Sequence, residues 1–243
     1  MNKFFRLTSL AAMTGLLISS SAFSAVTVYP MSVKMNQQGA GQIKIISGSK
    51  QTEYVKATVK KIENPGTKQE KERVLSQSES KNLIITPSKF GLASGTTRIT
   101  RLVNMIPPTK EQVYRVYFDP IQGLDNEKAP DSPNSSSKVG INISWGALIF
   151  VPPVTPEINF TLDAQKKAIT NTGNLHIELT RIGVCPEKNS DAGCTWEAIT
   201  KKIYPDQTFT LPASFKTSLK GVVKVEYRNW VDKKMTSKVF SLS

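Results

Sequence analysis

Short segments rich in valine, isoleucine, threonine and tyrosine recur along almost the whole chain, and turn residues separate them. These residue types favour extended backbone, whereas turns such as Asn64-Pro65-Gly66 end it. Before Pro152 we expect seven strands, at residues 25–29, 41–46, 54–62, 83–87, 97–103, 113–118 and 139–151. Seven short strands in about 130 residues are typical of an immunoglobulin-like β-sandwich. Because no helical periodicity extends beyond short turns, the predicted fold class is all-β.

The proline-rich segment from Val151 to Pro156 divides the chain, because such a segment forms a short, stiff hinge. After it we expect seven further strands, at residues 158–163, 167–170, 175–183, 196–203, 207–211, 221–227 and 234–242. The sequence therefore predicts two β-sandwich domains, at residues 25–151 and 152–243, each long enough for its own core.

The first 24 residues have the pattern of a secretion signal. Two basic residues precede an apolar core from Leu10 to Ile18, and Ala22-Phe23-Ser24 fits cleavage after Ser24. No later stretch approaches the roughly 18 apolar residues of a membrane helix, so we expect an exported, soluble product without membrane insertion. The formal net charge of +13 falls to +11 when the two basic residues of the signal are lost, which leaves the protein strongly basic.

Cys185 and Cys194 are the only cysteines, and both follow the hinge. In an exported chain, an even pair this close in sequence predicts one disulfide around the loop PEKNSDAG. The alternatives are two free thiols or half of a metal site. A metal site would need further ligands, and the sequence has no second CxxC motif and no histidine cluster, so we expect neither a metal nor another cofactor.

The predicted strand at residues 139–151 has one apolar face, formed by every second residue: Val139, Ile141, Ile143 and Trp145. A polar, proline-containing run from Gln122 to Lys138 precedes it and Pro152-Pro153 follows, and neither can extend a ladder. A strand delimited in this way could lie at a sheet edge and lend its apolar row to another protein. The alternative is that the row faces only the core of its own domain.

Catalytic and nucleic-acid-binding patterns are missing from the sequence. The single histidine, His176, has no nucleophile motif beside it, and neither a phosphate loop nor a dinucleotide fingerprint occurs. We therefore expect His176 to be a strand residue that is either hydrogen-bonded or exposed, and we do not expect the protein to be an enzyme. The lysines and arginines are scattered, without an aromatic pair or a recognition helix among them, which favours a solvated basic face over a nucleic-acid site.

Several motifs together resemble the periplasmic chaperones of the chaperone–usher pathway. They are the start AVTVYP after the signal, the turn Asn64-Pro65-Gly66, the spaced residues Thr86-Pro87, Leu92 and Gly95, then Ile106-Pro107-Pro108, the strand Val113–Phe118, the alternation before Pro152, and Asn171, Gly173 and Asn174. The sequences VYRVYF and CPEKNSDAGC are more similar to the alternative class, which serves colonisation-factor fimbriae, than to the classical one.

This resemblance implies that the protein binds fimbrial subunits, both major pilin and tip adhesin, in the periplasm and delivers them to an outer-membrane usher. A subunit lacks the last strand of its own sandwich, and the chaperone supplies one by donor-strand complementation. We expect Val139, Ile141 and Ile143 to enter the groove of the subunit, whereas Trp145, nearer the hinge, favours the core. The free protein could also cap this strand by forming a homodimer.

The resemblance further implies a basic anchor for the C-terminal carboxylate of the subunit, in the cleft between the domains. Arg115 is the first candidate, because a planar guanidinium can donate two hydrogen bonds to one carboxylate. Arg101 and Lys34 are weaker second candidates. Each of the three could instead be a solvated surface charge. The sequence departs here from the classical pattern, since Ala147 stands where that class has its anchoring lysine and Ser32 lies near the position of its arginine.

A fimbrial structural subunit or adhesin is the alternative function, because such proteins are also exported and immunoglobulin-like. Two full domains argue against it, since a subunit should have one incomplete domain that needs a donor strand.

Overall fold

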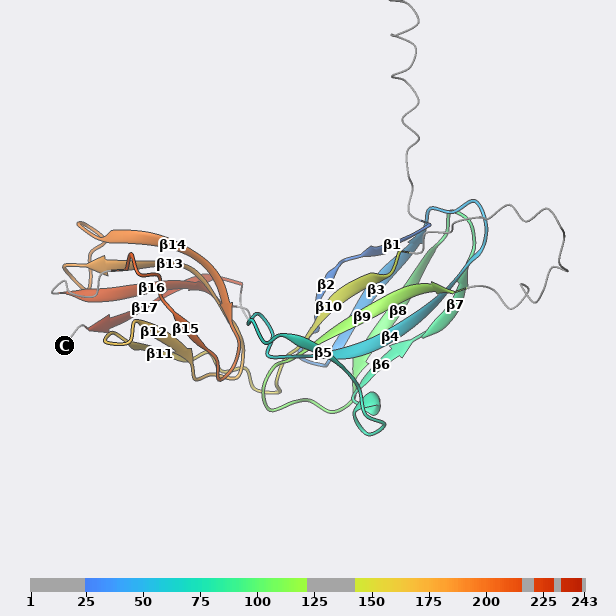
Figure 1. The fold of residues 1–243 in the computed structure, drawn as a ribbon, viewed down its shortest axis with the longest axis horizontal. Coiled ribbons are helices and arrows are strands. Elements are labelled where there is room, and N and C mark those ends of the chain that lie inside the picture. The colour runs from blue at the N-terminus through green and yellow to red at the C-terminus, as the bar shows by residue number, and fades with distance from the viewer. Residues whose placement is uncertain (1–24, 122–142, 216–220, 230–232, 242–243) are drawn as a thin grey trace, which may run out of the picture.

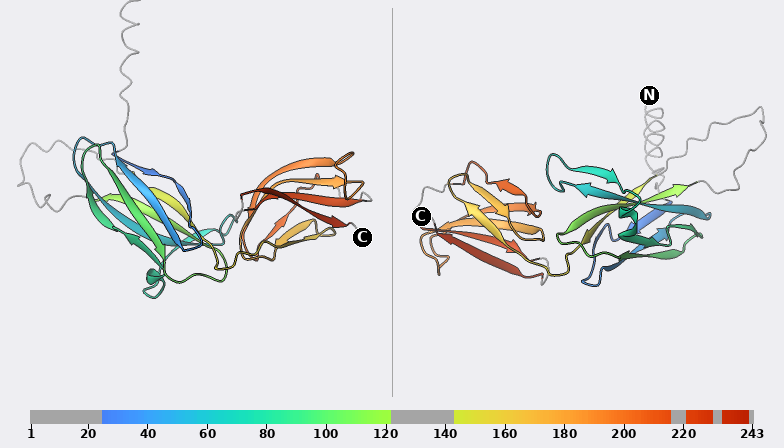
Figure 2. Two further views of the ribbon diagram at one scale, coloured as in Figure 1. Left: turned by 180° about the vertical axis from the view of Figure 1, so that it is seen from behind. Right: turned by 90° about the horizontal axis from the view of Figure 1, so that it is seen from below.

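The computed structural model describes residues 25–121, 143–215, 221–229 and 233–241, and nearly all of its regular structure is β-strand (Figure 1). Two β-sandwiches follow one another along the chain, and the views in Figure 2 show them as separate bodies joined at one end. The prediction of an all-β, two-sandwich fold is therefore confirmed. In the described residues, no helix is both long enough and apolar enough to cross a bilayer.

The first sandwich consists of two sheets. Sheet A has the order β1 (Val26–Tyr29), β3 (Ala40–Ser47), β8 (Thr97–Asn104) and β6 (Leu83–Thr86). Sheet B has the order β2 (Ser32–Lys34), β10 (Trp145–Val151), β9 (Gln112–Ile121), β4 (Glu53–Glu63) and β5 (Lys71–Val74), and β7 (Lys89–Leu92) also pairs with β4. One 3₁₀ turn, η1 (Glu79–Lys81), lies between β5 and β6.

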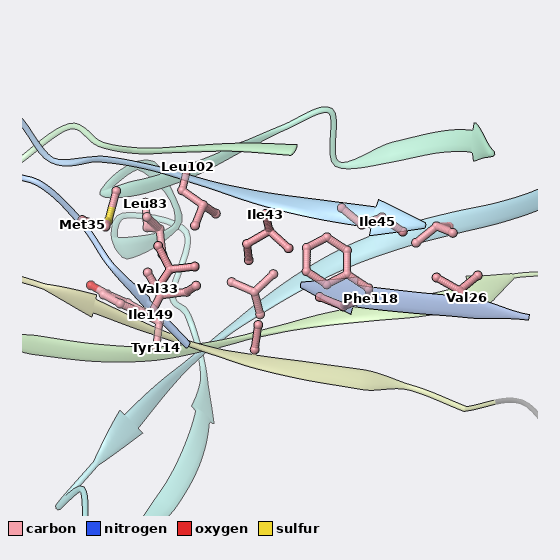
Figure 3. Close-up of a cluster of buried hydrophobic side chains, with 14 of the residues drawn as sticks. Val26, Val33, Met35, Ile43, Ile45, Leu83, Leu102, Tyr114, Phe118 and Ile149 are labelled. Atoms are coloured by element: carbon pink, nitrogen blue, oxygen red, sulfur yellow. The ribbon is translucent and has the colours of Figure 1, made fainter. Parts of the chain in front are cut away.

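Alternation along the strands builds the core between these sheets, because every second side chain points to the same face. Ile43, Ile45 and Leu102 of sheet A meet Phe118 and Ile149 of sheet B, and all five are 0% exposed (Figure 3). Each aliphatic or aromatic side chain buried in this way contributes roughly 1.5–3 kcal/mol. The outer faces of both sheets are left for charged residues and for partners.

The second sandwich also has two sheets. Sheet C has the order β11 (Phe160–Asp163), β12 (Ala168–Asn171) and β15 (Thr208–Thr210), and sheet D has the order β14 (Thr195–Ile203), β13 (Ile177–Cys185), β16 (Val222–Arg228) and β17 (Met235–Ser241). The predicted disulfide is confirmed: Cys185 is bonded to Cys194, with 4.1 Å between their Cα atoms.

The sequence missed three short strands and misplaced the start of the strand before the hinge. β2, β5 and β7 have only three or four residues each, and their sequences SVK, KERV and KFGL lack a run of β-branched residues, so only pairing with neighbouring strands makes them extended. The strand predicted from residue 139 begins at Trp145 in the structure. Val139, Ile141 and the predicted signal at residues 1–24 lie outside the described residues.

Candidate functional site

The edge of sheet B beside β10 is only partly covered. β2 runs parallel to β10 and pairs with Leu148, Ile149 and Phe150. Leu148 N donates to Met31 O at 2.9 Å on this side. In the described part of the chain, no strand pairs with residues 145–147 on the side away from β9. The first half of β10 therefore presents an open edge, to which another extended segment could add.

Side chains along β10 divide between the core and the outer face. Ala147, Ile149 and Val151 are buried in the core, and Trp145 packs against the same cluster, as its position near the hinge predicted. Ile143 precedes the strand and is 46% exposed. Its exposure leaves an aliphatic side chain available next to the open edge, which is what the donor-strand hypothesis requires.

Arg115 lies on β9, directly between β10 and β4, where it is opposite Leu148 on one side and Lys60 on the other. Its side chain points to the outer face of sheet B and is 29% exposed. The guanidinium is not simply solvated, because Nη1 donates to Glu72 Oε1 at 2.7 Å. Although burial acts to lower the pKa of Arg115, the hydroxyl of Tyr117 and the charge of Glu72 raise it, so the cation is permanent.

Lys34 lies on the same outer face, on the other side of β10. It ends β2 opposite Phe150, two residues nearer the hinge than Leu148. Together with Pro152, Pro156 and Lys233 it lines a cleft of about 460 Å³ at the junction of the domains. Burial and then the nearby charge of Lys202 lower the pKa of Lys34, whereas the charges of Glu178 and Glu111 act to raise it.

Arg115 and Lys34 therefore flank β10 on one face. Their strands are two inter-strand spacings apart, which corresponds to about 10 Å between backbones. Both side chains are long enough to reach a group placed over Leu148. The structure thus brings together the first candidate for the carboxylate anchor and one of the two weaker candidates.

Arg101 is not part of this arrangement. It lies on β8 in sheet A, where Thr100 and Leu102 on either side of it are buried and Arg101 itself is exposed on the outer face. The two outer faces of a sandwich point in opposite directions, with both sheets between them. Arg101 therefore cannot hold the same carboxylate as Arg115, and the expectation that it might serve as the second partner is corrected.

The far end of the same outer face is covered by the second domain. Ile62, Val113 and Phe150 of the first sandwich pack with Leu175 and Tyr204 of the second, in a cluster separate from either sandwich core. Two hydrogen bonds from the second domain reach the Asn64-Pro65-Gly66 turn, from Lys201 Nζ to Gly66 O at 2.8 Å and from Gln207 Nε2 to Pro65 O at 3.0 Å. Packed side chains and hydrogen bonds therefore stabilise the contact between the two domains next to the hinge.

A buried, hydrogen-bonded pair of side chains completes this joint. His176 is 1% exposed, and its Nδ1 lies 2.7 Å from Oε2 of Glu111, whose side chain is 0% exposed. The backbone N–H of His176 donates to the same carboxylate at 2.8 Å. The sequence predicted a satisfied or exposed histidine but gave no signal for Glu111, because the two residues lie 65 positions apart. The histidine therefore has a structural role between the domains.

A metal centre finds no support in the described residues. Cys185, Asp191 and Cys194 are the one group there whose ligand atoms lie close enough together, and both sulfur atoms are used by the disulfide. What the arrangement offers is an open strand edge with an exposed aliphatic side chain, and a pair of cations beside it.

Comparison with known proteins gives two curated relatives and a set of solved structures, whereas no family model matches the chain. The chain is 32% identical to a CFA/I fimbrial subunit of Escherichia coli over 212 residues, which cover 86% of this chain and 87% of that protein. It is 31% identical to a CS1 fimbrial subunit of Escherichia coli over 198 residues, which cover 80% and 83%.

The structural relatives are described as chaperones. The crystal structure of the class 5 fimbrial chaperone CfaA superposes with a TM-score of 0.73 at 29% identity, covering 89% of this chain and 98% of that one. A chain from the chaperone–tip adhesin complex of CFA/I fimbriae biogenesis superposes with a TM-score of 0.70 at 28% identity, covering 88% and 97%. Both matches extend over the two sandwiches.

Proposed function

Since the chain belongs to the fimbrial chaperones of the chaperone–usher pathway, it acts as a periplasmic chaperone in pilus biogenesis, and we propose that residues 139–147 form its subunit-binding edge. The observation that carries this proposal is the open edge at residues 145–147, directly after the exposed Ile143. An incomplete subunit exposes apolar surface and unpaired backbone groups, and an added strand satisfies both.

The two parts of such an edge contribute differently. Backbone hydrogen bonds to β10 supply affinity that does not depend on the sequence of the subunit. Val139, Ile141 and Ile143 would fill alternate pockets of the groove, each contributing about 1–2 kcal/mol of apolar burial. Trp145 and Ala147 pack toward the chaperone's own core and would act as the rigid base from which the preceding residues extend.

The carboxylate anchor is proposed to consist of Arg115 and Lys34, on either side of β10. A subunit strand that extends along this edge meets β2 at Leu148, so its free end would lie between the two cations. Arg115 supplies a charge-assisted, geometrically specific contact, and Lys34 supplies a point charge at the mouth of the cleft.

Capture of a subunit by variants of the open edge tests the donor-strand proposal. Ile143→Asp should abolish co-purification with a pilin co-expressed from the same operon, because the carboxylate would enter an apolar pocket unpaired. The matched control is Ile99→Asp, since Ile99 is also 46% exposed but lies on sheet A. Equal capture by the two variants, both folded, would contradict the proposal.

Capture by variants of the anchor tests the second part. Arg115→Ala should weaken the complex by about 2–5 kcal/mol while the chaperone stays folded, and Arg115→Lys should restore only part of it. Arg101→Ala is the control, because it removes an outward arginine from the opposite sheet. Wild-type capture by a folded Arg115→Ala variant would transfer the anchor to Lys34.

We also propose export by a signal cleaved after Ser24, binding of both major pilin and tip adhesin, and delivery of the complexes to an outer-membrane usher. The family membership supports these steps. A homodimer that caps the open edge is a further proposal, and it predicts that Ile143→Asp shifts the free protein to a monomer in sedimentation analysis.

A further inference from the structure

A cluster of polar side chains holds Arg115 in place, and none of these other side chains has been given a role in the proposed site. Glu72, on β5, lies at its centre and is 22% exposed. It accepts hydrogen bonds from Arg115 Nη1 at 2.7 Å, from the Tyr117 hydroxyl at 2.7 and 2.9 Å, and from Lys60 Nζ at 3.3 Å. The cluster spans three neighbouring strands on the outer face of sheet B.

The surroundings of Glu72 favour the ionised form of its carboxylate. Burial acts to raise its pKa, but the hydrogen bonds from Tyr117 and Lys60 and the charge of Arg115 together lower it. A charged acceptor with three donors has little freedom to rotate away. It therefore fixes the position of the Arg115 guanidinium, which on an isolated surface arginine would sample many rotamers.

Only one corner of the guanidinium is used in this contact. Within the described residues, Nη1 alone donates a hydrogen bond, and Nη2 lies 3.9 Å from Glu70 Oε1, beyond hydrogen-bonding distance. The side formed by Nε and Nη2 is a planar fork that matches the two oxygens of a carboxylate. Fixing Nη1 thus leaves Nε and Nη2 without a hydrogen bond in the described residues, since the ion pair of Nη2 with Glu70 is too long for one.

One arginine can bind two carboxylates at once, as Arg73 does on β5, next to Glu72 in the sequence. Arg73 donates from Nε to Glu63 at 2.6 Å and from Nη1 and Nη2 to Glu79 at 2.8 and 2.7 Å. A second carboxylate could therefore bind Arg115 without displacing Glu72.

The donor strand also leaves room for this arrangement at Gly146. A Cβ atom at that position would lie 3.0 Å from Cδ of Arg115 and 3.0 Å from Cε1 of Tyr117. Distances this short would force the arginine stem to move. The missing side chain on β10 therefore lets the stem of Arg115 lie across the strand that a subunit would join.

We infer that Glu72, supported by Tyr117 and Lys60, is a positioning residue that presents the Nε–Nη2 side of Arg115 to the terminal carboxylate of a bound subunit. The inference rests on the proposed anchor role of Arg115. It deepens that proposal, because it predicts that specificity for a carboxylate depends on a residue that never touches the subunit.

The test uses the full-length mature chaperone and a synthetic peptide of the last strand of the co-expressed pilin, with either a free C-terminal carboxylate or an amide. Wild type should prefer the carboxylate form, and Glu72→Ala should reduce binding of that form about tenfold while binding of the amide form is unchanged. Gly146→Ala should act in the same direction, because it displaces the arginine stem. Glu63→Ala is the control, since it removes a comparably exposed carboxylate, 29% against 22%, from β4, which pairs with β5.

A double-mutant cycle separates the possible outcomes. In the Arg115→Ala background, Glu72→Ala should change carboxylate binding less than about twofold, because the positioned group is gone. An equal loss in both backgrounds would mean a structural effect, and tighter binding by Glu72→Ala would mean that Glu72 competes with the subunit; either result overturns the inference. If Arg115→Ala itself leaves the carboxylate preference intact, the anchor assignment fails as well.

Discussion

His176→Ala should destabilise the joint between the two domains strongly. The substitution removes the imidazole that faces the Glu111 carboxylate at 2.7 Å, in a place where both side chains are inaccessible to water. It also removes a ring that lies between two aromatic side chains, with centroid distances of 5.5 Å to Phe150 and 5.2 Å to Tyr204. The side-chain hydrogen bond and the ring packing are lost together.

The expected magnitude follows from these contacts. Removing the side-chain hydrogen-bond partner of a buried carboxylate costs about 3 kcal/mol or more, because the desolvation of that group is left uncompensated. The backbone N–H of His176 still donates to Glu111 at 2.8 Å in the variant, which favours the lower end of that range. The lost ring packing adds about 1 kcal/mol. We therefore expect a total of about 4 kcal/mol, a large part of the 5–15 kcal/mol typical of a folded protein.

Calorimetry of the purified chaperone measures this effect directly. In the wild type the two domains should unfold together in one thermal transition. In His176→Ala the transition temperature should fall, and the single transition should separate into two. The control is Lys110→Ala, one residue before Glu111 in sequence. It removes an ion pair with Asp206 in which both side chains are more than half exposed, so it should cost at most about 1 kcal/mol. A loss below about 1 kcal/mol for His176→Ala would refute the role of the pair as a joint.

Other predictions concern the disulfide, the second domain and acid stability. Cys185→Ser should destabilise the second domain by roughly 2–3 kcal/mol and leave subunit capture largely intact; two thiols titrated in the unreduced, unfolded wild type would refute the bridge. Gly183→Ala should cost roughly 1–3 kcal/mol in a denaturant titration, because its Cβ would lie 2.6 Å from the Trp196 ring. Since the pKa of Glu72 is lowered in the folded state, its ionised carboxylate stabilises the fold above the ordinary pKa of 4.5, and this stabilisation is lost as the pH falls through the lowered pKa. The free energy of unfolding, measured by denaturant titration at a series of acidic pH values, should therefore fall more steeply with pH for the wild type than for Glu72→Gln.

The longest strands were predicted from their own alternation, without any knowledge of the strands that pair with them. β3, β8 and β9 have eight to ten residues, and buried side chains alternate with more exposed ones along most of each strand, so their burial pattern could be predicted from period alone. β2 could not, because its three residues are extended only through pairing with β10. The missed strand β2 matters for the proposed function, since it covers residues 148–150 of β10 and leaves residues 145–147 as the open edge.

Contacts between residues far apart in the sequence could not be predicted, for a different reason. Arg115 was predicted as an anchor from its residue type and its strand, but its contact with Glu72 depends on the order of three neighbouring strands. Glu111 and His176 meet only because two domains dock. Sequence patterns predict which face a side chain points to, whereas the partner on that face is set by topology.

The outer face of sheet B connects the proposed anchor to the joint. Arg115 and Val113 are successive outward residues of β9, as Leu148 and Phe150 are of β10. Val113 and Phe150 belong to the cluster shared with the second domain, and Leu148 packs against its border. A strand added along β10 can therefore advance no further than the row of Arg115 and Leu148, where β2 on the edge and the second domain on the face both begin. The free carboxylate of a subunit would end at that row because the chaperone leaves no room beyond it. In the proposed anchor the cation pair would therefore need to recognise only a chain end, and the length of the open edge would set the register at which that end arrives.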